Sequence, residues 1–161
     1  MKKYVLNFED ILSAKERVEG FAHKTPVLTS IGIDEIVGKK LYFKCENMQR
    51  VGAFKFRGAW NAISMISEED LENGVCTHSS GNHAQAIALV AKLKGVPAHI
   101  VMPENSPRVK LNAVKGYGAN VILCAPTLEA RESAAKKVME KTGAHFIHPY
   151  NNPNVIAGQG T

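Results

Sequence analysis

From residue 75 onward the sequence alternates between short apolar runs and longer amphipathic runs. The apolar runs carry β-forming residues and predict strands, whereas the amphipathic runs have the apolar spacing of helices. The predicted strands are Val75–His78, Ala98–Met102, Asn120–Cys124 and His145–His148, and the predicted helices between them are Ala84–Lys94, Pro107–Tyr117 and Leu128–Lys141. This alternation predicts an α/β fold, a parallel sheet with helices on both faces.

Glycine and proline support these boundaries. Gly95, Gly116 and Gly143 stand where the helices should stop, because glycine readily adopts the left-handed conformation that ends a helix. Outside the alternating region we expect helices at Phe8–Phe21 and Lys55–Ile66, a strand at Lys40–Glu46 and a helix that begins near Asn154, with Pro153 in its first turn.

The composition is that of a globular protein, with 45% hydrophobic and 22% charged residues and no apolar run long enough to cross a bilayer. The first residues, Met1–Phe8, do not form a signal peptide because Asn7, Glu9 and Asp10 break the apolar stretch. We therefore expect a cytoplasmic protein without membrane contact. The three cysteines are widely spaced in apolar contexts and predict buried, reduced thiols: Cys45, Cys76 and Cys124.

The net charge of +5 does not indicate nucleic-acid binding. The 20 lysines and arginines are scattered over the amphipathic helices and form no stripe interleaved with aromatic residues. A solvated basic surface accounts for them.

Lys55 is the first residue that points to chemistry. It stands between Phe54 and Phe56, and apolar surroundings disfavour the ammonium form, leaving more free amine to attack a carbonyl. The pattern therefore indicates a lysine that forms a Schiff base. The alternative is an ordinary lysine that extends from the start of a helix toward solvent.

A second motif, Ser79–His83, lies between the strand that ends at His78 and the helix expected from Ala84. The first amides of a helix have no partner within it, so a carboxylate or phosphate can bind there. The alternative is a plain helix cap made by Ser80 or Asn82.

Together the two motifs resemble the fold-type II pyridoxal phosphate enzymes, and within them the serine racemase and serine/threonine dehydratase group. The paired serines before Gly81 are similar to the pattern of eukaryotic-type serine racemases and hydroxyaspartate dehydratases, while threonine dehydratases typically have alanine at position 80. The resemblance runs from about Phe8 to Thr161 and includes three further segments: Lys24–Ser30, Phe43–Asn47 and Ala157–Thr161.

The resemblance implies roles for the residues of both motifs. Lys55 would bind pyridoxal phosphate covalently and, once displaced by the substrate amine, act as a base. Ser80 would exchange the substrate proton on the opposite face, and Phe54 would pack beside the cofactor unless it belongs to the core. Asn82 would donate to the phenolic oxygen of the cofactor. The backbone amides that would hold the substrate carboxylate belong to Ser79, Ser80, Gly81, Asn82 and His83.

Other residues also have expected roles, some of them with an alternative. Arg131 matches an arginine that reaches the substrate carboxylate, the alternative being a surface ion pair with Glu129 or Glu132. The side chain of His83 is expected to be structural, and Arg57 is expected in a buried ion pair. Racemases often have asparagine where Tyr150 stands. The resemblance also implies a nucleotide-binding site, whose candidate residues are Ser30, Arg50, Gln85 and Tyr117.

The length of 161 residues is about half of what the resembling family has, so we expect an N-terminal half. Residues 1–53 would belong to a large domain, residues 54–146 would form a small α/β domain, and residues 147–161 would return into the large domain. The resemblance places the phosphate-binding loop and the metal ligands beyond residue 161. It also implies Mg²⁺, ATP and a homodimer for the full-length enzyme.

Three functions follow. The favoured one is a racemase that also dehydrates L-serine, and L-threonine as a further substrate, to a 2-oxo acid and ammonia. The second is a dehydratase of threonine or 3-hydroxyaspartate without racemase activity. The third is a stand-alone chain that binds a ligand or partner without catalysis, and we expect the isolated 161-residue chain to be inactive.

Overall fold

The structure, a computed structural model, describes residues 5–161. Its centre is a four-stranded sheet in the order β5-β4-β3-β6, in which every neighbouring pair is parallel. The strands are β3 (Val75–His78), β4 (Ala98–Pro103), β5 (Asn120–Cys124) and β6 (His145–Phe146). The parallel sheet expected from the sequence is confirmed, although β6 is two residues shorter than predicted.

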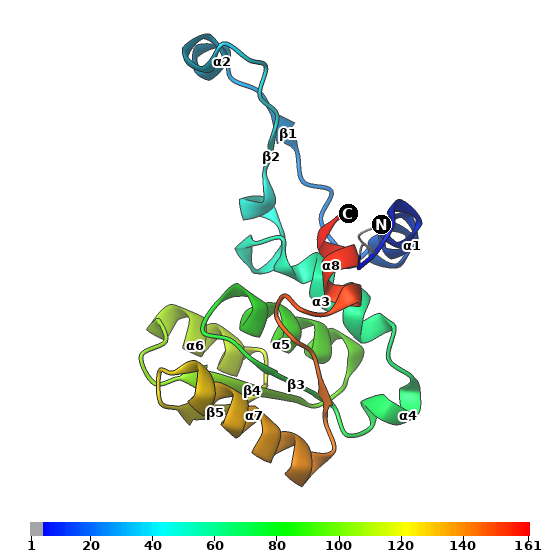
Figure 1. Ribbon diagram of the computed structural model, residues 1–161, viewed down its shortest axis with the longest axis vertical. Helices are drawn as coiled ribbons and strands as arrows, with labels where there is room; N and C mark the ends of the chain where they lie inside the picture. The colour runs from blue at the N-terminus through cyan, green and yellow to red at the C-terminus, as the bar shows by residue number, and fades with distance from the viewer. Residues whose placement is uncertain (1–4) are drawn as a thin grey trace.

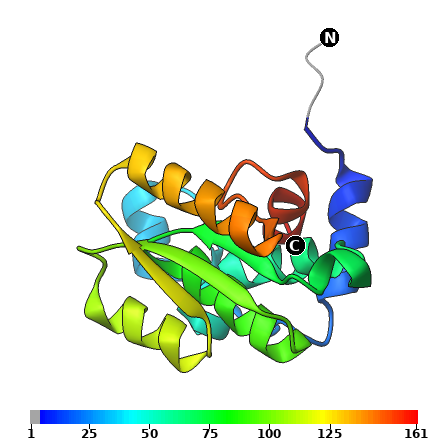
Figure 2. The same ribbon diagram turned by 90° about the horizontal axis from the view of Figure 1, so that it is seen from below.

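Helices cover both faces of this sheet (Figures 1 and 2). α5 (Asn82–Lys94) and α6 (Arg108–Gly116) lie on one face, and α7 (Leu128–Thr142) lies on the other. Successive strand residues point to opposite faces, so Val75 packs under α5 whereas Cys76 packs under α7. Among residues 5–161, no helix is both long enough and apolar enough to span a membrane.

α3 (Lys55–Ser64) connects the sheet layer to the rest of the chain. It packs against α5 and crosses α8 (Pro153–Gln159), and both α3 and α8 contact α1 (Phe8–Val18). The α3–α8 crossing is close because glycines face each other: a Cβ on Gly158 would lie 2.6 Å from the Arg57 carbonyl oxygen, and one on Gly58 would lie 2.7 Å from the Val155 carbonyl oxygen. The start of α3 is therefore fixed by residues about a hundred positions later.

A long arm projects from the base of α3 (Figure 1). It consists of β1 (Val27–Leu28), α2 (Ile31–Val37) and β2 (Phe43–Lys44), and β1 pairs antiparallel with β2. α2 buries none of its residues. The sequence predicted a strand over Lys40–Glu46, which was too long, because the chain enters a 3₁₀ turn, η1 (Glu46–Met48), soon after β2.

Several other boundaries differ from the prediction. α1 ends at Val18 instead of Phe21, because Gly20 adopts a left-handed φ of 82°. α3 stops at Ser64, two residues early. The sequence also missed four short elements, which offer too few residues for a periodic pattern to be recognised: β1, α2, η2 (Arg50–Gly52) and α4 (Glu68–Leu71).

The three cysteines are free thiols. Cys76 and Cys124 are buried as expected, and burial raises the pKa of the Cys76 thiol to about 11. The prediction of a buried thiol is wrong for Cys45, which is partly exposed because it follows β2 at the base of the arm.

Candidate active site

A cavity of about 440 Å³ opens beyond the carboxyl end of β3. Four parts of the chain meet there: the start of α3, the turn between β3 and α5, the start of α7 and the loop that follows β6. In parallel α/β sheets ligands bind at this edge. The residues that line the cavity are Phe54, Lys55, His78, Ser79, Ser80, Gly81, Asn82, His83, Leu128, Arg131, Pro149 and Tyr150.

Lys55 is the first residue of α3, as the sequence predicted. Its Nζ donates a hydrogen bond to the Pro149 carbonyl oxygen at 2.9 Å, and burial lowers the pKa of its amine. Nζ also lies 5.3 Å from the centre of the Phe54 ring. Phe54 is 44% exposed, so the alternative that it packs in the core is wrong.

The turn before α5 leaves the first helical amides without a side-chain cap. Gly81 is the N-cap residue and no side chain caps the helix, while Ser79 Oγ accepts a hydrogen bond from the Gly81 amide at 3.2 Å. The alternative of a plain cap by Ser80 or Asn82 is therefore wrong. The free amides and the helix dipole favour an anion at this position.

His83 presents a neutral ring beneath this turn. It is 2% exposed, and burial lowers its pKa to about 3. Nε2 lies 3.4 Å from the Ile147 carbonyl oxygen, which can only accept, so the hydrogen of the ring lies on Nε2. Nδ1 is then a buried acceptor without a partner among residues 5–161.

The loop after β6 is held by His148. Its Nδ1 accepts hydrogen bonds from the amides of Tyr150 at 3.3 Å and Asn151 at 2.9 Å. The Tyr150 ring stands edge-on to the His148 ring, with the centroids 4.5 Å apart. His148 in turn contacts Phe146 and His78 edge-on. The sequence did not predict this aromatic row, whose members lie up to 72 residues apart.

Arg131 had two interpretations, a contact to the substrate carboxylate and a surface ion pair. Arg131 lines the cavity and its Nε donates to the Thr127 carbonyl oxygen at 3.2 Å. The structure shows no ion pair between it and Glu129 or Glu132 among the residues described, so that alternative is wrong.

Arg57 forms the expected ion pair with Glu46, 2.8 Å apart. Burial acts to raise the pKa of the Glu46 carboxyl, but hydrogen bonds from Arg57 and Thr25 outweigh it and lower that pKa. The pair joins the base of the arm to α3, away from the cavity.

The four candidate nucleotide residues do not form one cluster. Ser30 caps α2 at the far end of the arm (Figure 1). Arg50 donates to the Phe21 carbonyl oxygen, Gln85 is buried in α5, and Tyr117 follows α6. Gln85 Nε2 has no hydrogen-bond partner within residues 5–161.

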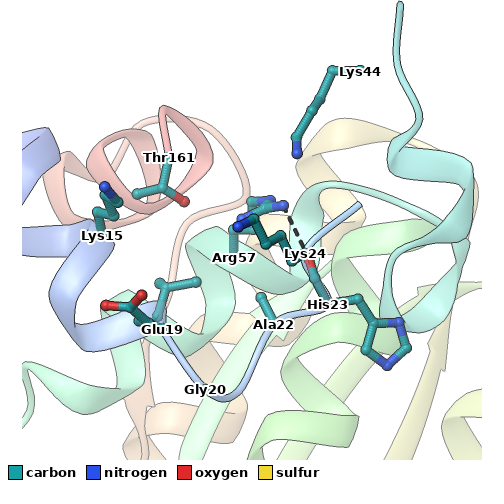
Figure 3. A pocket seen from close by; sticks show the side chains of 10 residues that line it. Lys15, Glu19, Gly20, Ala22, His23, Lys24, Lys44, Arg57 and Thr161 are labelled. Atoms are coloured by element: carbon teal, nitrogen blue, oxygen red, sulfur yellow. Dashed lines mark hydrogen bonds between the residues drawn. The ribbon is translucent and has the colours of Figure 1, made fainter. Parts of the chain in front are cut away.

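A second hollow, of about 320 Å³, shares none of its lining with the Lys55 cavity. It lies between the end of α1, the base of the arm and the end of α8 (Figure 3). Arg57 donates to the His23 carbonyl oxygen within it. Positive side chains predominate among its charged and polar lining residues, which are Lys15, Glu19, His23, Lys24, Lys44, Arg57 and Thr161.

The Lys55 cavity fits pyridoxal phosphate. It offers a half-buried amine with a lowered pKa, an exposed aromatic ring beside that amine and uncapped helix amides across the cavity. An amine of this kind reacts with an aldehyde, and an aromatic ring packs against a planar heterocycle.

A parallel α/β fold with such a lysine defines a fold-type II pyridoxal phosphate enzyme, and comparison with known proteins agrees. The pattern of the "Pyridoxal-phosphate dependent enzyme" family matches residues 18–161, and the chain belongs to this family.

Within the family the chain is similar to serine racemases. It is 54% identical to the serine racemase of Dictyostelium discoideum over 97% of this chain and 48% of that relative. It is 52% identical to the L-threo-3-hydroxyaspartate ammonia-lyase of Saccharomyces cerevisiae over 98% of this chain and 48% of that relative. The structure of maize serine racemase superposes with a TM-score of 0.93 and 50% identity, over 96% of this chain and 47% of the maize chain. The chain thus spans about half the length of the curated relatives it matches.

Proposed function

We propose that the chain forms part of a pyridoxal phosphate-dependent serine racemase that also dehydrates L-serine, and L-threonine as a further substrate, to a 2-oxo acid and ammonia. The observation that carries this proposal is that the Lys55 amine, the Ser80 hydroxyl and the uncapped amides of α5 line one cavity. A racemase needs both a base and a second proton carrier, together with a site for the substrate carboxylate.

Pyridoxal phosphate, when bound, supplies an electron sink that acidifies the substrate Cα proton. In the proposed mechanism Lys55 Nζ takes this proton from one face of the substrate. Its lowered pKa keeps more of the amine unprotonated and able to accept. Ser80 Oγ returns a proton to the other face, which inverts the configuration at Cα.

The remaining residues of the cavity would orient the substrate. Among residues 79–83, the Ser79 amide donates to the Val101 carbonyl oxygen at 3.0 Å and the Gly81 amide to Ser79 Oγ at 3.2 Å. The amides of Ser80, Asn82 and His83, at the positive end of the α5 dipole, would bind the substrate carboxylate. Arg131 would supply a second positive contact to it from α7, across the cavity. Phe54 would pack beside the cofactor, and the Asn82 side chain would donate to its phenolic oxygen.

A hydroxyaspartate dehydratase is the second candidate. It is favoured by the 52% identity to the yeast ammonia-lyase and by Tyr150 at a position where racemases often have asparagine. Both candidates use Lys55 in the same way, so they differ in the need for Ser80. The third interpretation, a non-catalytic chain, predicts no covalent cofactor at all.

We further propose that the division into residues 1–53, 54–146 and 147–161 reflects two domains of a larger homodimeric, cytoplasmic enzyme that binds Mg²⁺ and ATP. The arm projects from the rest of the chain and α2 buries none of its residues, as expected if a further part of the large domain packs against them. Within residues 5–161 no three His, Cys, Asp or Glu side chains are grouped to hold a metal. Binding of ATP and Mg²⁺ by the completed enzyme, measured by calorimetry, tests this assignment.

The first test is mass spectrometry of the 161-residue chain after incubation with pyridoxal phosphate and reduction with borohydride. We expect one cofactor-sized adduct that maps to Lys55, and none in Lys55→Ala. Circular dichroism of both proteins establishes that they are folded. A folded chain that forms no selective adduct would contradict the proposal that its Lys55 is primed for the cofactor in the absence of further sequence.

A further inference from the structure

The side chain of Asn82 is held from outside the cavity. Asn82 is the first residue of α5 and lines the cavity. Its Oδ1 accepts a hydrogen bond from Lys110 Nζ at 2.6 Å. Lys110 lies in the first turn of α6, 28 residues along the chain, and is not among the residues that line the cavity.

This contact decides which way the carboxamide faces. A lysine ammonium has three donors and no acceptor, so it bonds only to the oxygen of the amide. With Oδ1 turned toward α6, the Nδ2 group on the other side of the amide plane keeps both of its hydrogens for other partners. The orientation is therefore set by chemistry and does not depend on how the two similar ends of the amide are distinguished.

The ammonium also adds charge at a sensitive place. The N-terminus of a helix is already positive, and a cation near it is unfavourable unless an anion is also present. Lys110 meets α5 at this end, next to amides that lack a side-chain cap. Its charge therefore increases the attraction of the turn for an anion.

We propose that Lys110 is a positioning residue of the active site. It holds the Asn82 carboxamide with its NH₂ group as a donor to the cavity, where an electron-rich oxygen of the cofactor is its partner, and it strengthens the anion site at the start of α5. The inference rests on the proposed function for the identity of that partner, while the orientation itself rests on the contact alone.

The orientation is tested on the cofactor-free 161-residue chain by ¹⁵N-edited NMR. The Asn82 side-chain NH₂ signals are assigned by their loss in Asn82→Asp. Lys110→Met keeps the aliphatic stem but removes the donor, and Lys110→Arg keeps a donor and the charge. Lys115→Met, on the same helix, is the matched control.

We expect the Asn82 signals to shift and broaden in Lys110→Met, to be largely restored in Lys110→Arg and to be unchanged in Lys115→Met. Unchanged Asn82 signals in Lys110→Met would overturn the proposal.

The role toward the cofactor is read from the absorption spectrum after pyridoxal phosphate is added. A donor to the phenolic oxygen changes the protonation of the cofactor. We therefore expect the visible absorption band of Lys110→Met to shift in wavelength and to depend on pH differently from that of the parent. The band of Lys110→Arg should stay close to that of the parent. If the NMR signals change and the spectrum does not, the orientation by Lys110 stands, and the contact between Asn82 and the cofactor in the proposed function is wrong. If no variant, including the parent, acquires the band, the proposal that Lys55 of this chain binds the cofactor without further sequence fails, independently of the NMR result.

Discussion

At the scale of single residues, the protonation of Lys55 controls the proposed chemistry. Burial lowers the pKa of this amine in the folded chain, so its unprotonated fraction at a given pH exceeds that of a lysine in water, whose pKa is about 10.4. The folded chain should therefore react with an aldehyde at a lower pH than an unstructured segment with the same residues.

We predict that the rate of adduct formation at Lys55 rises with pH and reaches its half-maximal value at a lower pH than for a short peptide of residues 53–58. The measurement is borohydride trapping with peptide mapping between about pH 7 and pH 12, a range that includes the pKa of about 10.4 of a lysine in water. Identical profiles for protein and peptide would show that burial does not activate the amine.

Ser80 separates the two proposed activities. When the chain is joined to the remaining half of the Dictyostelium relative, we expect Ser80→Ala to lower D-serine formation by a factor of about 100 or more, since a positioned acid or base contributes about 10²–10⁴-fold. Dehydration of L-serine should fall much less, because proton removal by Lys55 is retained. The ratio of the two products, measured chromatographically, is the readout. An unchanged ratio would mean that Ser80 is not the second proton carrier.

The sequence predicted Lys55 and the turn at residues 79–83 because each is a local motif with its own chemistry. It did not predict Lys110, which is an unremarkable lysine in an amphipathic helix until the fold brings it to Asn82. The row from His78 to Tyr150 was missed for the same reason. Contacts between distant positions have no periodicity or spacing by which a single sequence could show them.

At the scale of elements, prediction succeeded where the pattern was long. β3 and β5 were predicted to the residue, and α5 and α7 to within two residues, because alternation and glycine stops agree there. The region between α1 and Lys55 was predicted poorly, because its elements are short and α2 buries no residue. Val51 shows the difficulty: it adopts a left-handed φ of 58°, which is rare for a β-branched residue.

The crossing of α3 and α8 positions Lys55, so it should tolerate no added volume. A Cβ at position 158 would lie 2.6 Å from both the Arg57 carbonyl oxygen and the Asn61 Cβ. We expect Gly158→Ala to lower the free energy of unfolding by about 1–3 kcal/mol, the usual range for forced overpacking. Gly32→Ala is the control, because a Cβ there meets nothing within 4 Å and alanine favours a helix by about 1 kcal/mol.

Urea denaturation followed by circular dichroism measures both variants. Equal stability of Gly158→Ala and the parent would show that the helices can move apart, and adduct formation at Lys55 would then report whether the lysine moves with them.

At the scale of the whole molecule, many of the exposed large apolar side chains lie on the arm. The arm exposes large apolar side chains, among them Ile31 at 80% and Ile36 at 86%, while the chain matches about half of its relatives' length. Exposed apolar surface of this extent is typical of an interaction site. The cationic hollow at the base of the arm lies on the same part of the molecule (Figure 3).

We predict that the separately expressed remaining half of the Dictyostelium relative associates with the 161-residue chain, and that Ile36→Lys weakens this association at least tenfold. The substitution should leave the melting temperature of the isolated chain nearly unchanged, because α2 buries no residue. Analytical ultracentrifugation and thermal melting give the two readouts. Association through another face would be indicated if Ile36→Lys bound as tightly as the parent.

The side-by-side packing of α1 and α8 has a practical consequence. A Cβ on Gly160 would lie 3.2 Å from Ile11 Cδ1, and Thr161 lines the hollow at the base of the arm. The end of α8 therefore lies beside the foot of the arm, while α2 lies far from it (Figure 1). A donor dye near Gly160 and an acceptor dye on α2 would therefore report the position of the arm by Förster resonance energy transfer, which is low while the arm is extended. Bending of the arm toward the end of α8 would increase the acceptor fluorescence, so that binding of an unlabelled partner could be followed.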